Sequence, residues 1–233
     1  MSKVSLVGMT APSAATGCNT ANQLIAYAAR VSNPGNQNNE KTAPKLLRYL
    51  IENEHWSPFE MVSITMEIVT TRDISRQILR HRSFSFQEFS QRYAVSEDFV
   101  YREARLQDPK NRQNSIPLEK PSNSKDSLST PQSRLYENWN MKQAEVIQKS
   151  KEVYEWALSN GIAKEQARAV LPEGNTETTL YMAGTLRSWI HYCGLRMANG
   201  TQKEHSIVAT QCWSIISQHF PDVAEAVAWM NAE

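Results

Sequence analysis

Residues 62–68 carry the pattern that most restricts the fold of this 233-residue chain. Apolar residues at 62, 64, 66 and 68 alternate with polar residues at 63, 65 and 67. A period of two is the period at which side chains alternate between the faces of a β-strand. The fold must therefore contain a sheet with one face against a core and one more polar face.

The rest of the chain shows one more strand pattern and several helical patterns. The strand is expected at 3–9. Helices are expected at 20–32, 42–55, 72–82, 131–160, 163–171, 178–197 and 203–219, with a short one after Pro221. This order predicts an α+β (mixed α/β) fold, in which a central, mostly antiparallel sheet is flanked by helices and the C-terminal half is rich in helix.

Several residues indicate where these helices begin and end. Thr42 with Pro44, Asp73, and Thr130 with Pro131 are expected at N-termini, and Gly161 is expected to end the longest helix. That helix carries apolar side chains along one stripe, which we expect to be buried: Leu135, Trp139, Val146, Val153 and Ala157.

No internal repeat and no second core is evident, so residues 1–233 are expected to form a single domain. Residues 106–129 are rich in Pro, Ser, Asn and charged residues without periodicity, which predicts an exposed, mobile loop.

The composition excludes two classes of function. With 40% hydrophobic and 21% charged residues, the chain has no apolar run near the roughly 20 residues that a membrane-spanning helix needs. A net charge of +1 argues against a protein that coats long nucleic acid. The first residues lack the apolar core of a secretory signal, so a cytoplasmic protein without a membrane partner is expected.

The cysteines and glycines exclude several common sites. Cys18, Cys193 and Cys212 are far apart in the sequence, which indicates neither a disulfide framework nor a metal site. The eight glycines include neither GxGxxG nor GxxxxGK[ST]. If the protein binds a nucleotide, side chains must hold the phosphates, and arginine is suited to this because its planar guanidinium binds phosphate bidentately.

Such side chains are concentrated in the segment RHRSFSFQEFSQRY at 80–93. An extended chain there would present Glu88, Ser90 and Arg92 on one side, where Arg92 and Ser90 could hold the phosphate of a nucleoside monophosphate. Two simpler interpretations remain open: a solvated face carrying the nearby arginines, and an ion pair of Glu88 with Arg80 or Arg92.

The helix expected at 178–197 contains a second unusual group. Its buried stripe would be formed by Leu186, Trp189, Ile190 and Cys193, and Arg196 lies one heptad beyond Trp189. Arg196 could reach a site or extend into water. Arg187 and His191 form an i, i+4 pair on an adjacent face, and Gly184 would leave room for a ligand to approach the backbone.

Residues 80–93 resemble the signature RHRxxSxNExSxRY of the flavin-dependent thymidylate synthases, with Gln87 in place of the usual asparagine. The resemblance extends over most of the chain outside 94–130. It includes AARVS at 28–32, His55, SPFE at 57–60, Arg76-Gln77, Gln166-Ala167-Arg168 through Leu171-Pro172, and Leu195-Arg196 with Gln202 and Glu204.

The resemblance implies an enzyme that converts dUMP to dTMP with FAD as redox cofactor, 5,10-methylenetetrahydrofolate as carbon donor and NADPH as reductant. It also implies a homotetramer with active sites shared between subunits. The residues that match the family's dUMP contacts are Gln77, Arg80, Glu88, Phe89, Ser90, Gln91, Arg92, Arg168 and Arg196. Those that match its FAD contacts are Ser57, Arg80, His81, Arg82, Glu88, Thr185, Leu186, Arg187 and His191, although asparagine is common at 185 and 191.

The chemistry expected of these residues is electrostatic. Arg196 is the catalytic candidate, because a guanidinium beside uracil would stabilise negative charge on N3 and O2. No cysteine follows a proline, so the thiolate nucleophile of flavin-independent thymidylate synthases is absent, and Ser90 is assigned to binding. Two alternatives remain open: a single-stranded nucleic-acid-binding module, and a protein that binds flavin and nucleotide without catalysis.

Overall fold

The computed structural model describes residues 2–96, 98–118 and 130–230, with the side chains of 228–230 excepted. Its strands are β1 (Lys3–Met9), β2 (Ser63–Thr71), β3 (Ser85–Glu88), β4 (Arg105–Gln107), β5 (Ser115–Pro117) and β6 (Glu177–Thr185). Its α-helices are α1 (Ala21–Ala29), α2 (Ala43–Glu52), α3 (Arg72–Ile78), α4 (Pro131–Ser159), α5 (Lys164–Ala167), α6 (Leu186–Met197), α7 (Lys203–His219) and α8 (Pro221–Met230). Short 3₁₀ turns include η4 (Ser57–Met61) and η6 (Arg168–Val170).

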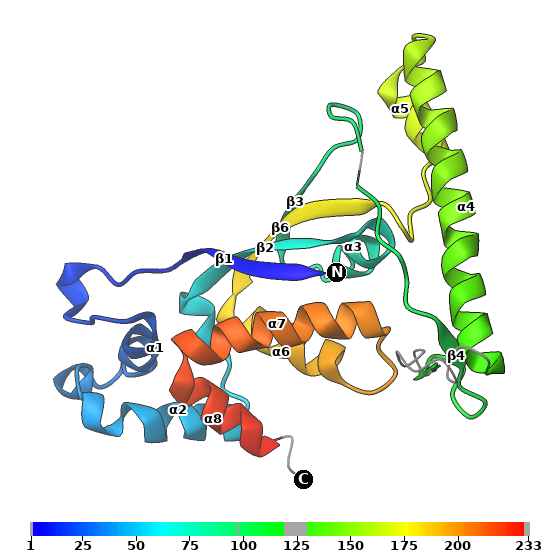
Figure 1. The fold of residues 1–233 in the computed structure, drawn as a ribbon. Coiled ribbons are helices and arrows are strands. Elements are labelled where there is room, and N and C mark those ends of the chain that lie inside the picture. The colour runs from blue at the N-terminus through cyan, green and yellow to red at the C-terminus, as the bar shows by residue number, and fades with distance from the viewer. Residues whose placement is uncertain (1, 97, 119–129, 231–233) are drawn as a thin grey trace.

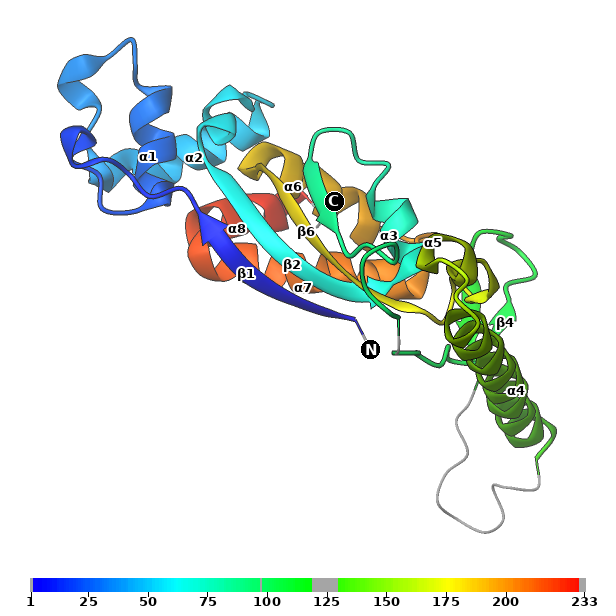
Figure 2. The same ribbon diagram turned by 90° about the horizontal axis from the view of Figure 1, so that it is seen from above.

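The main sheet has the strand order β1-β2-β6-β3, and every neighbouring pair is antiparallel (Figure 2). Its centre is the nine-residue pairing of β2 with β6, in which Met66 lies opposite Met182 and Ile68 opposite Leu180. These four side chains are fully buried, whereas Glu67 and Tyr181 point to the other face and hydrogen-bond to each other there. The α+β fold with an antiparallel sheet is therefore confirmed.

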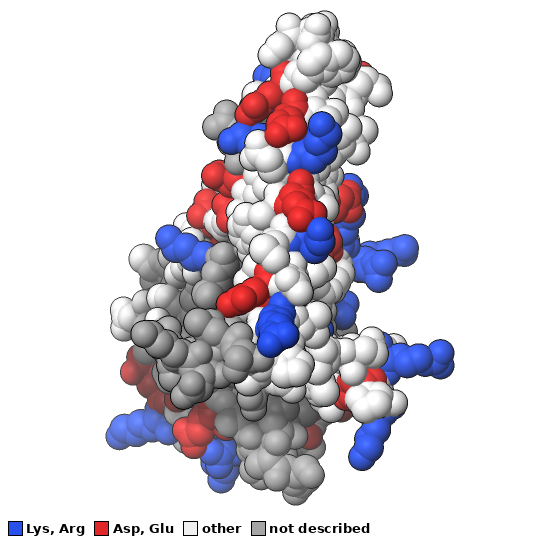
Figure 3. All heavy atoms as spheres, turned by 45° about the vertical axis from the view of Figure 1, so that its right-hand side comes forward, with Lys and Arg blue, Asp and Glu red and all other residues white. Residues whose placement is uncertain are grey.

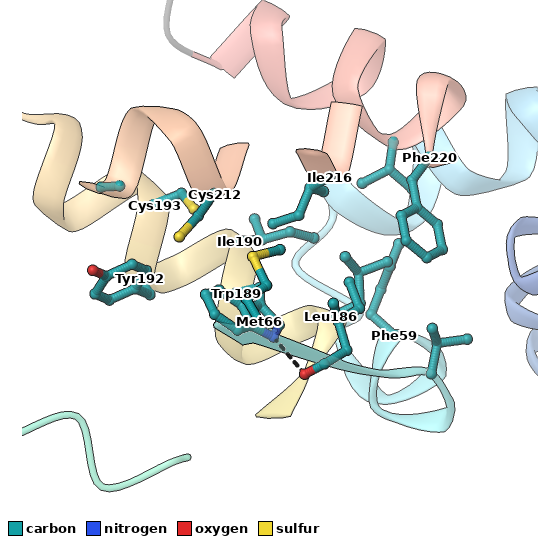
Figure 4. Packing of buried hydrophobic residues seen from close by; sticks show 14 of the residues in the cluster. Phe59, Met66, Leu186, Trp189, Ile190, Tyr192, Cys193, Cys212, Ile216 and Phe220 are labelled. Carbon is teal, nitrogen blue, oxygen red and sulfur yellow. Dashed lines mark hydrogen bonds between the residues drawn. The ribbon is translucent and has the colours of Figure 1, made fainter. Parts of the chain in front are cut away.

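Helices α6 and α7 lie against the buried face of the sheet and supply nine of the 27 buried residues of the main core (Figure 1). Trp189 of α6 is fully buried, and its indole Nε1 donates to the backbone oxygen of Ile64 at 3.1 Å. Figure 4 shows this bond, with Met66 beside the indole and Cys193 and Cys212 close together between the two helices. The bond holds α6 against β2 and satisfies the buried N–H of the indole.

The helix expected at 178–197 is two elements. Residues 177–185 form β6, and α6 begins at the next residue, with Thr185 as its N-cap. The predicted helix was too long at its N-terminal end. The apolar stripe that defines α6 does not extend back through Thr178 and Thr179. Thr178, Leu180 and Met182 are buried at a period of two, and β-branched residues favour a strand.

Two other boundaries differ from the sequence-based expectation. Helix α3 begins at Arg72 with Thr71, and not Asp73, at the N-cap, and it ends at Ile78, so that Arg80 and His81 lie beyond it. Strand β3 ends at Glu88, and residues 91–93 form a turn, so the segment 88–93 is not extended throughout. The other expected starts are correct: Pro44 lies in the first turn of α2, and Thr130 accepts a hydrogen bond from Ser133 N at the start of α4.

The long helix α4 projects from the end of the sheet opposite α1 and α2 (Figures 1 and 2). The expected buried stripe is wrong for most of its length, because Leu135, Trp139 and Val146 are 48%, 42% and 51% exposed. Ala157 is buried with Tyr154 in a small separate core. Nearer its N-terminal end, Trp139 and Gln143 of α4 donate hydrogen bonds to the backbone oxygen of Arg102.

The expected loop at 106–129 contains ordered structure at its start. Strands β4 and β5 pair as a small antiparallel hairpin over residues 105–117. Residues 119–129, the rest of the expected loop, lie outside the described residues. No helix of the described residues is long and apolar enough to cross a membrane.

Gly184 does not leave room for a ligand, because the ring of Phe84 occupies the space above it. A Cβ at this position would lie 2.4 Å from Phe84 Cδ1. The ring cannot move away easily, since it is 9% exposed and packs edge-to-face on Trp189 with ring centroids 4.9 Å apart.

We therefore expect Gly184→Ala to lower the free energy of unfolding by about 1–3 kcal/mol, the usual cost of overpacking a core. Gly194→Ala is the matched control, because Gly194 lies in α6 with nothing within 4 Å of an added Cβ. The control is expected to be up to about 1 kcal/mol more stable through helix propensity. Urea denaturation of both variants tests this, and equal stability of Gly184→Ala and the unmodified protein would contradict the packing argument.

Candidate functional site

The pairing of β2 with β6 brings the ends of α3 and α6 together. Thr71, the last residue of β2, is the N-cap of α3, and Thr185, the last residue of β6, is the N-cap of α6. The strands are antiparallel, so the two helices start at opposite ends of the pair. A nine-residue strand spans about 30 Å, and helices of 7 and 12 residues together span about 28 Å. Their C-terminal ends consequently meet, and both helices pack on α7.

The first predicted site residues to meet there are His81 and Arg196, which are 115 positions apart in sequence. Arg196 Nε donates to His81 Nε2 at 2.9 Å. A guanidinium can only donate, so His81 Nε2 must be unprotonated and the neutral ring must carry its proton on Nδ1. Partial burial and the adjacent Arg196 cation lower the pKa of His81 to about 4. The pair therefore holds Arg196 without neutralising its charge.

Gln77 reaches the same region from the last turn of α3. Its Oε1 lies 3.2 Å from Nδ1 of His205 on α7, and its Nε2 donates to Gln202 Oε1 at 2.8 Å. His205 Nε2 lies 3.1 Å from the hydroxyl of Tyr192 on α6. His205 and Tyr192 were missed by sequence reasoning. A signal for His205 was present, because it lies on the same face of α7 as buried Val208, Ala209 and Cys212.

Glu88 is held by partners other than the arginines considered from the sequence. It accepts hydrogen bonds from Ser75 at 2.8 Å and Thr178 at 3.1 Å, and Arg72 lies 3.6 Å away. It therefore joins β3, α3 and β6 from a half-buried position. Through these bonds Glu88 holds the end of β3 against α3 and β6.

A second group of predicted residues lies on the other side of α3. A cavity of about 210 Å³ is lined by Arg72, Arg76, Arg168, Gln91 and Glu173, with Ala169 and Leu171. Three guanidiniums and one carboxylate around a small cavity fit an oxyanion such as phosphate. Arg76 is paired with Glu173, and Arg168 is half-buried in η6.

The neighbouring predicted residues line this region less directly. Arg92 is exposed and pairs with Glu165 at 3.2 Å, and the hydroxyl of Ser90 accepts from the backbone nitrogen of Arg92 at 3.3 Å. The Gln91 side chain is buried and donates to Ser96 at 3.0 Å. Phe89 is 37% exposed.

A third group surrounds the start of α6 and η4. His191 packs edge-to-face on Trp56, with ring centroids 4.5 Å apart, and Arg187 pairs with Glu60. Burial and the nearby Arg187 cation lower the pKa of His191. Ser57 is exposed beside them, and Thr185 caps the helix by accepting from Ser188 N. The side chain of Leu186 is fully buried in the core, so only its backbone could reach a ligand.

The three groups remain distinct in one chain. Arg187 and Arg196 are nine residues apart on α6, which is about 13 Å along a helix axis. Arg80 and Arg82 are exposed between the groups and form no ion pair with the described residues. Among these residues no cluster of His, Cys, Asp or Glu is arranged to hold a metal ion.

An α+β fold whose sheet end gathers guanidiniums, neutral histidines and amides defines a protein that binds anionic nucleotides through side chains. The thymidylate synthase complementing protein (Thy1) family matches residues 15–222. A probable flavin-dependent thymidylate synthase of Paramecium bursaria Chlorella virus 1 is 50% identical over 97% of this chain and 98% of its own length. The flavin-dependent thymidylate synthase of a Synechocystis strain is 51% identical over 88% of this chain and 89% of its own length.

The chain belongs to the flavin-dependent thymidylate synthase family. Its structure is also similar to that of a UMP/dUMP methylase, PolB from Streptomyces cacaoi, bound with 5-Br dUMP. The two share 26% sequence identity, with a TM-score of 0.79 over 98% of this chain and 95% of the other.

Stability should depend on pH through the buried histidine. Burial, Arg196 and His81 lower the pKa of His205 to about 3, whereas an unfolded histidine has a pKa of about 6.5. Between these values the unfolded chain binds a proton that the folded chain does not. The free energy of unfolding should therefore fall as the pH falls from about 7 to about 5, by up to about 1.4 kcal/mol per pH unit from this residue.

Urea denaturation across that range measures the slope. His205→Asn should show a shallower slope, because no titrating ring remains at 205. His219→Asn, at the exposed end of the same helix, is the control and should keep the slope of the unmodified protein. Identical slopes for the 205 and 219 variants would show that His205 is not held neutral.

Proposed function

We propose that this protein catalyses the reductive methylation of dUMP to dTMP, with FAD as redox cofactor, 5,10-methylenetetrahydrofolate as carbon donor and NADPH as reductant. The observation that carries the proposal is the 2.9 Å contact of Arg196 with His81. It unites the two most specific parts of the family resemblance, the signature at 80–93 and the arginine at 196. The relatives named above and the dUMP methylase of similar structure support the same activity.

The residues around the start of α6 fit a flavin dinucleotide. A diphosphate needs fixed cations where no glycine-rich loop is present, and Arg80, Arg82 and Arg187 present exposed guanidiniums. The rings of His191 and Trp56 pack edge-to-face near the start of the same helix. These residues, with Ser57, His81, Thr185 and the backbone of Leu186, would hold the cofactor. When bound, the flavin would supply the hydride, which no amino-acid side chain can provide.

The arginine-lined cavity beside α3 is the site that we assign to the dUMP phosphate. Arg168 enters it directly, and Arg76 and Arg72 add positive charge. Arg92 and Ser90 lie on the adjoining turn, and Arg92 would have to exchange its exposed partner Glu165 for the phosphate. Such an exchange costs little, because exposed ion pairs contribute little stability. Phe89, Gln91 and Glu88 would shape the binding turn.

Arg196 acts on the base in this proposal. A cation beside uracil stabilises the negative charge that develops as carbon 5 becomes nucleophilic, and it does so without transferring a proton. His81 orients this cation by accepting from its Nε. A cysteine pathway has no support, because burial raises the pKa of both the Cys193 and the Cys212 thiols.

We further propose a single-domain subunit that assembles as a homotetramer with shared active sites, acting in the cytoplasm. Two features support assembly. The predicted contacts form three groups in one chain, and a site shared with a neighbouring copy would bring them together. The solvent face of α4 carries mixed charges separated by uncharged surface (Figure 3), and its exposed residues include Leu135, Trp139, Val146 and Trp156.

The nucleic-acid alternative loses two of the four aromatic side chains that it requires, whereas Phe89 and Tyr93 are exposed. It depends on Phe84, Phe86, Phe89 and Tyr93 as a stacking surface. Phe84 packs on Trp189 in the core, and Phe86 is half-buried against it. A non-catalytic flavin and nucleotide binder is distinguished by activity alone.

The activity test is tritium release from dUMP labelled at carbon 5, since methylation replaces that hydrogen. We expect release that depends on FAD, NADPH and methylenetetrahydrofolate together. Omission of each component in turn is the control. Absence of release from protein that binds both FAD and dUMP would refute the synthase proposal and favour the non-catalytic alternative.

Replacing Arg196 should separate binding from turnover. Arg196→Ala is expected to retain the flavin absorbance but to lose about a hundredfold or more in kcat, the usual cost of removing a group that stabilises developing charge. Arg48→Ala, which breaks an exposed ion pair with Glu225, is the matched control and should leave kcat unchanged. Unchanged turnover in Arg196→Ala would contradict the catalytic assignment.

A further inference from the structure

We infer that His205 is a positioning residue that fixes the Gln77 side-chain amide in the one orientation able to donate to the uracil ring of dUMP. The inference rests on the proposed function, because it takes Gln77 as a contact of the base. His205 lies in α7, is 0% exposed, and belongs to none of the groups of residues assigned to substrate or cofactor.

A continuous series of hydrogen bonds passes through His205. Tyr192 Oη lies 3.1 Å from His205 Nε2, and His205 Nδ1 lies 3.2 Å from Gln77 Oε1. Gln77 Nε2 lies 2.8 Å from Gln202 Oε1, and Gln202 Nε2 lies 3.0 Å from Glu204 Oε2. The series thus joins α6, α7, the end of α3 and the residues that start α7.

The carboxylate of Glu204 determines the direction of every bond in this series. An ionised carboxylate only accepts, so Gln202 must turn its NH₂ toward Glu204 and its oxygen toward Gln77. Gln77 must then direct its NH₂ to Gln202 and its oxygen to His205, which donates from Nδ1. His205 Nε2 is left as an acceptor for the Tyr192 hydroxyl. Glu204 also forms an ion pair with Arg102, whose Nη1 lies 3.5 Å from Glu204 Oε2.

This direction decides what Gln77 can offer to a ligand. One N–H of its amide is used by Gln202, and the second has no partner among the described residues. Uracil carries carbonyl oxygens that accept such a donor. A reversed amide would instead present an oxygen and would place it against the oxygen of Gln202, which is repulsive. Gln202, oriented by Glu204, therefore disfavours the orientation that could not bind a base carbonyl. His205 holds the productive orientation by donating from Nδ1 to Gln77 Oε1.

The surroundings of His205 keep its ring neutral. The ring centroids of His205 and His81 are 6.3 Å apart, and Tyr192 lies between α7 and His81, with its ring 4.8 Å from that of His81. The charged groups that face this position are Arg196, from α6, and Glu204 at the start of α7. A proton added at Nε2 would bring a further positive charge toward Arg196, so the neutral ring is favoured.

The experiment compares three variants in the full-length protein by tritium release and by dUMP titration in a calorimeter. His205→Leu removes both hydrogen bonds and should raise KM and Kd for dUMP about tenfold, with kcat changed less and flavin absorbance retained. His205→Asn keeps a donor in place of Nδ1 and should recover most of that loss. His219→Asn, a histidine at the exposed end of the same helix, is the control and should behave as the unmodified protein.

A second measurement does not depend on activity. NMR of protein labelled with ¹⁵N-histidine should show His205 with a protonated Nδ1 and an unprotonated Nε2, assigned by the signal that is lost in His205→Asn. If the protein neither binds nor methylates dUMP, the proposed function fails, while this tautomer still tests the hydrogen-bond series. A tautomer protonated on Nε2, or dUMP affinity unchanged in a folded His205→Leu protein, would overturn the inference.

Discussion

The antiparallel pairing of β2 with β6 is the constraint on which the candidate site depends. Each strand passes into a helix without a linker, and the antiparallel direction sends the two helices toward each other along one sheet face. Their combined length is close to that of the strands, so His81 and Arg196 meet. A one-residue slip of register would turn Met66 and Ile68 out of the core, and it would also separate the two helix ends.

The site formed there is polar but carries little compensating negative charge. Arg196 donates a hydrogen bond to the neutral ring of His81. The neutral ring of His205 contacts the side-chain amide of Gln77. A carboxylate in contact with Arg196 would have stabilised the fold more simply, but it would have cancelled the positive charge that the proposed reaction needs. The carboxylate of Glu204 instead acts at a distance, through the direction of hydrogen bonds.

The residues assigned to the site form three separate groups in one chain. The proposed assembly would explain the long helix α4 as a surface that contacts a second copy. A 29-residue helix with exposed Trp139 and Trp156 contributes only a small core at one end of the subunit. Its apolar stripe, expected to be buried from the sequence, is the kind of surface that a second copy would cover. The prediction that this stripe is buried is wrong for most of its length within one chain.

The sequence by itself determined the strands at 3–9 and 62–68, the helices at 131–160 and 203–219, and the arginine-rich signature, because these depend on local periodicity, capping and residue type. The segment 177–185 was predicted as helix, although its period of two and its threonines favour a strand, and its pairing with β2 settles the assignment. The sequence could not show that Phe84 fills the space above Gly184, or that Glu88 bonds Ser75 and Thr178. Those partners, and the place of His205 between Gln77 and Tyr192, depend on residues that are distant in sequence, and only the register of the sheet brings them into contact.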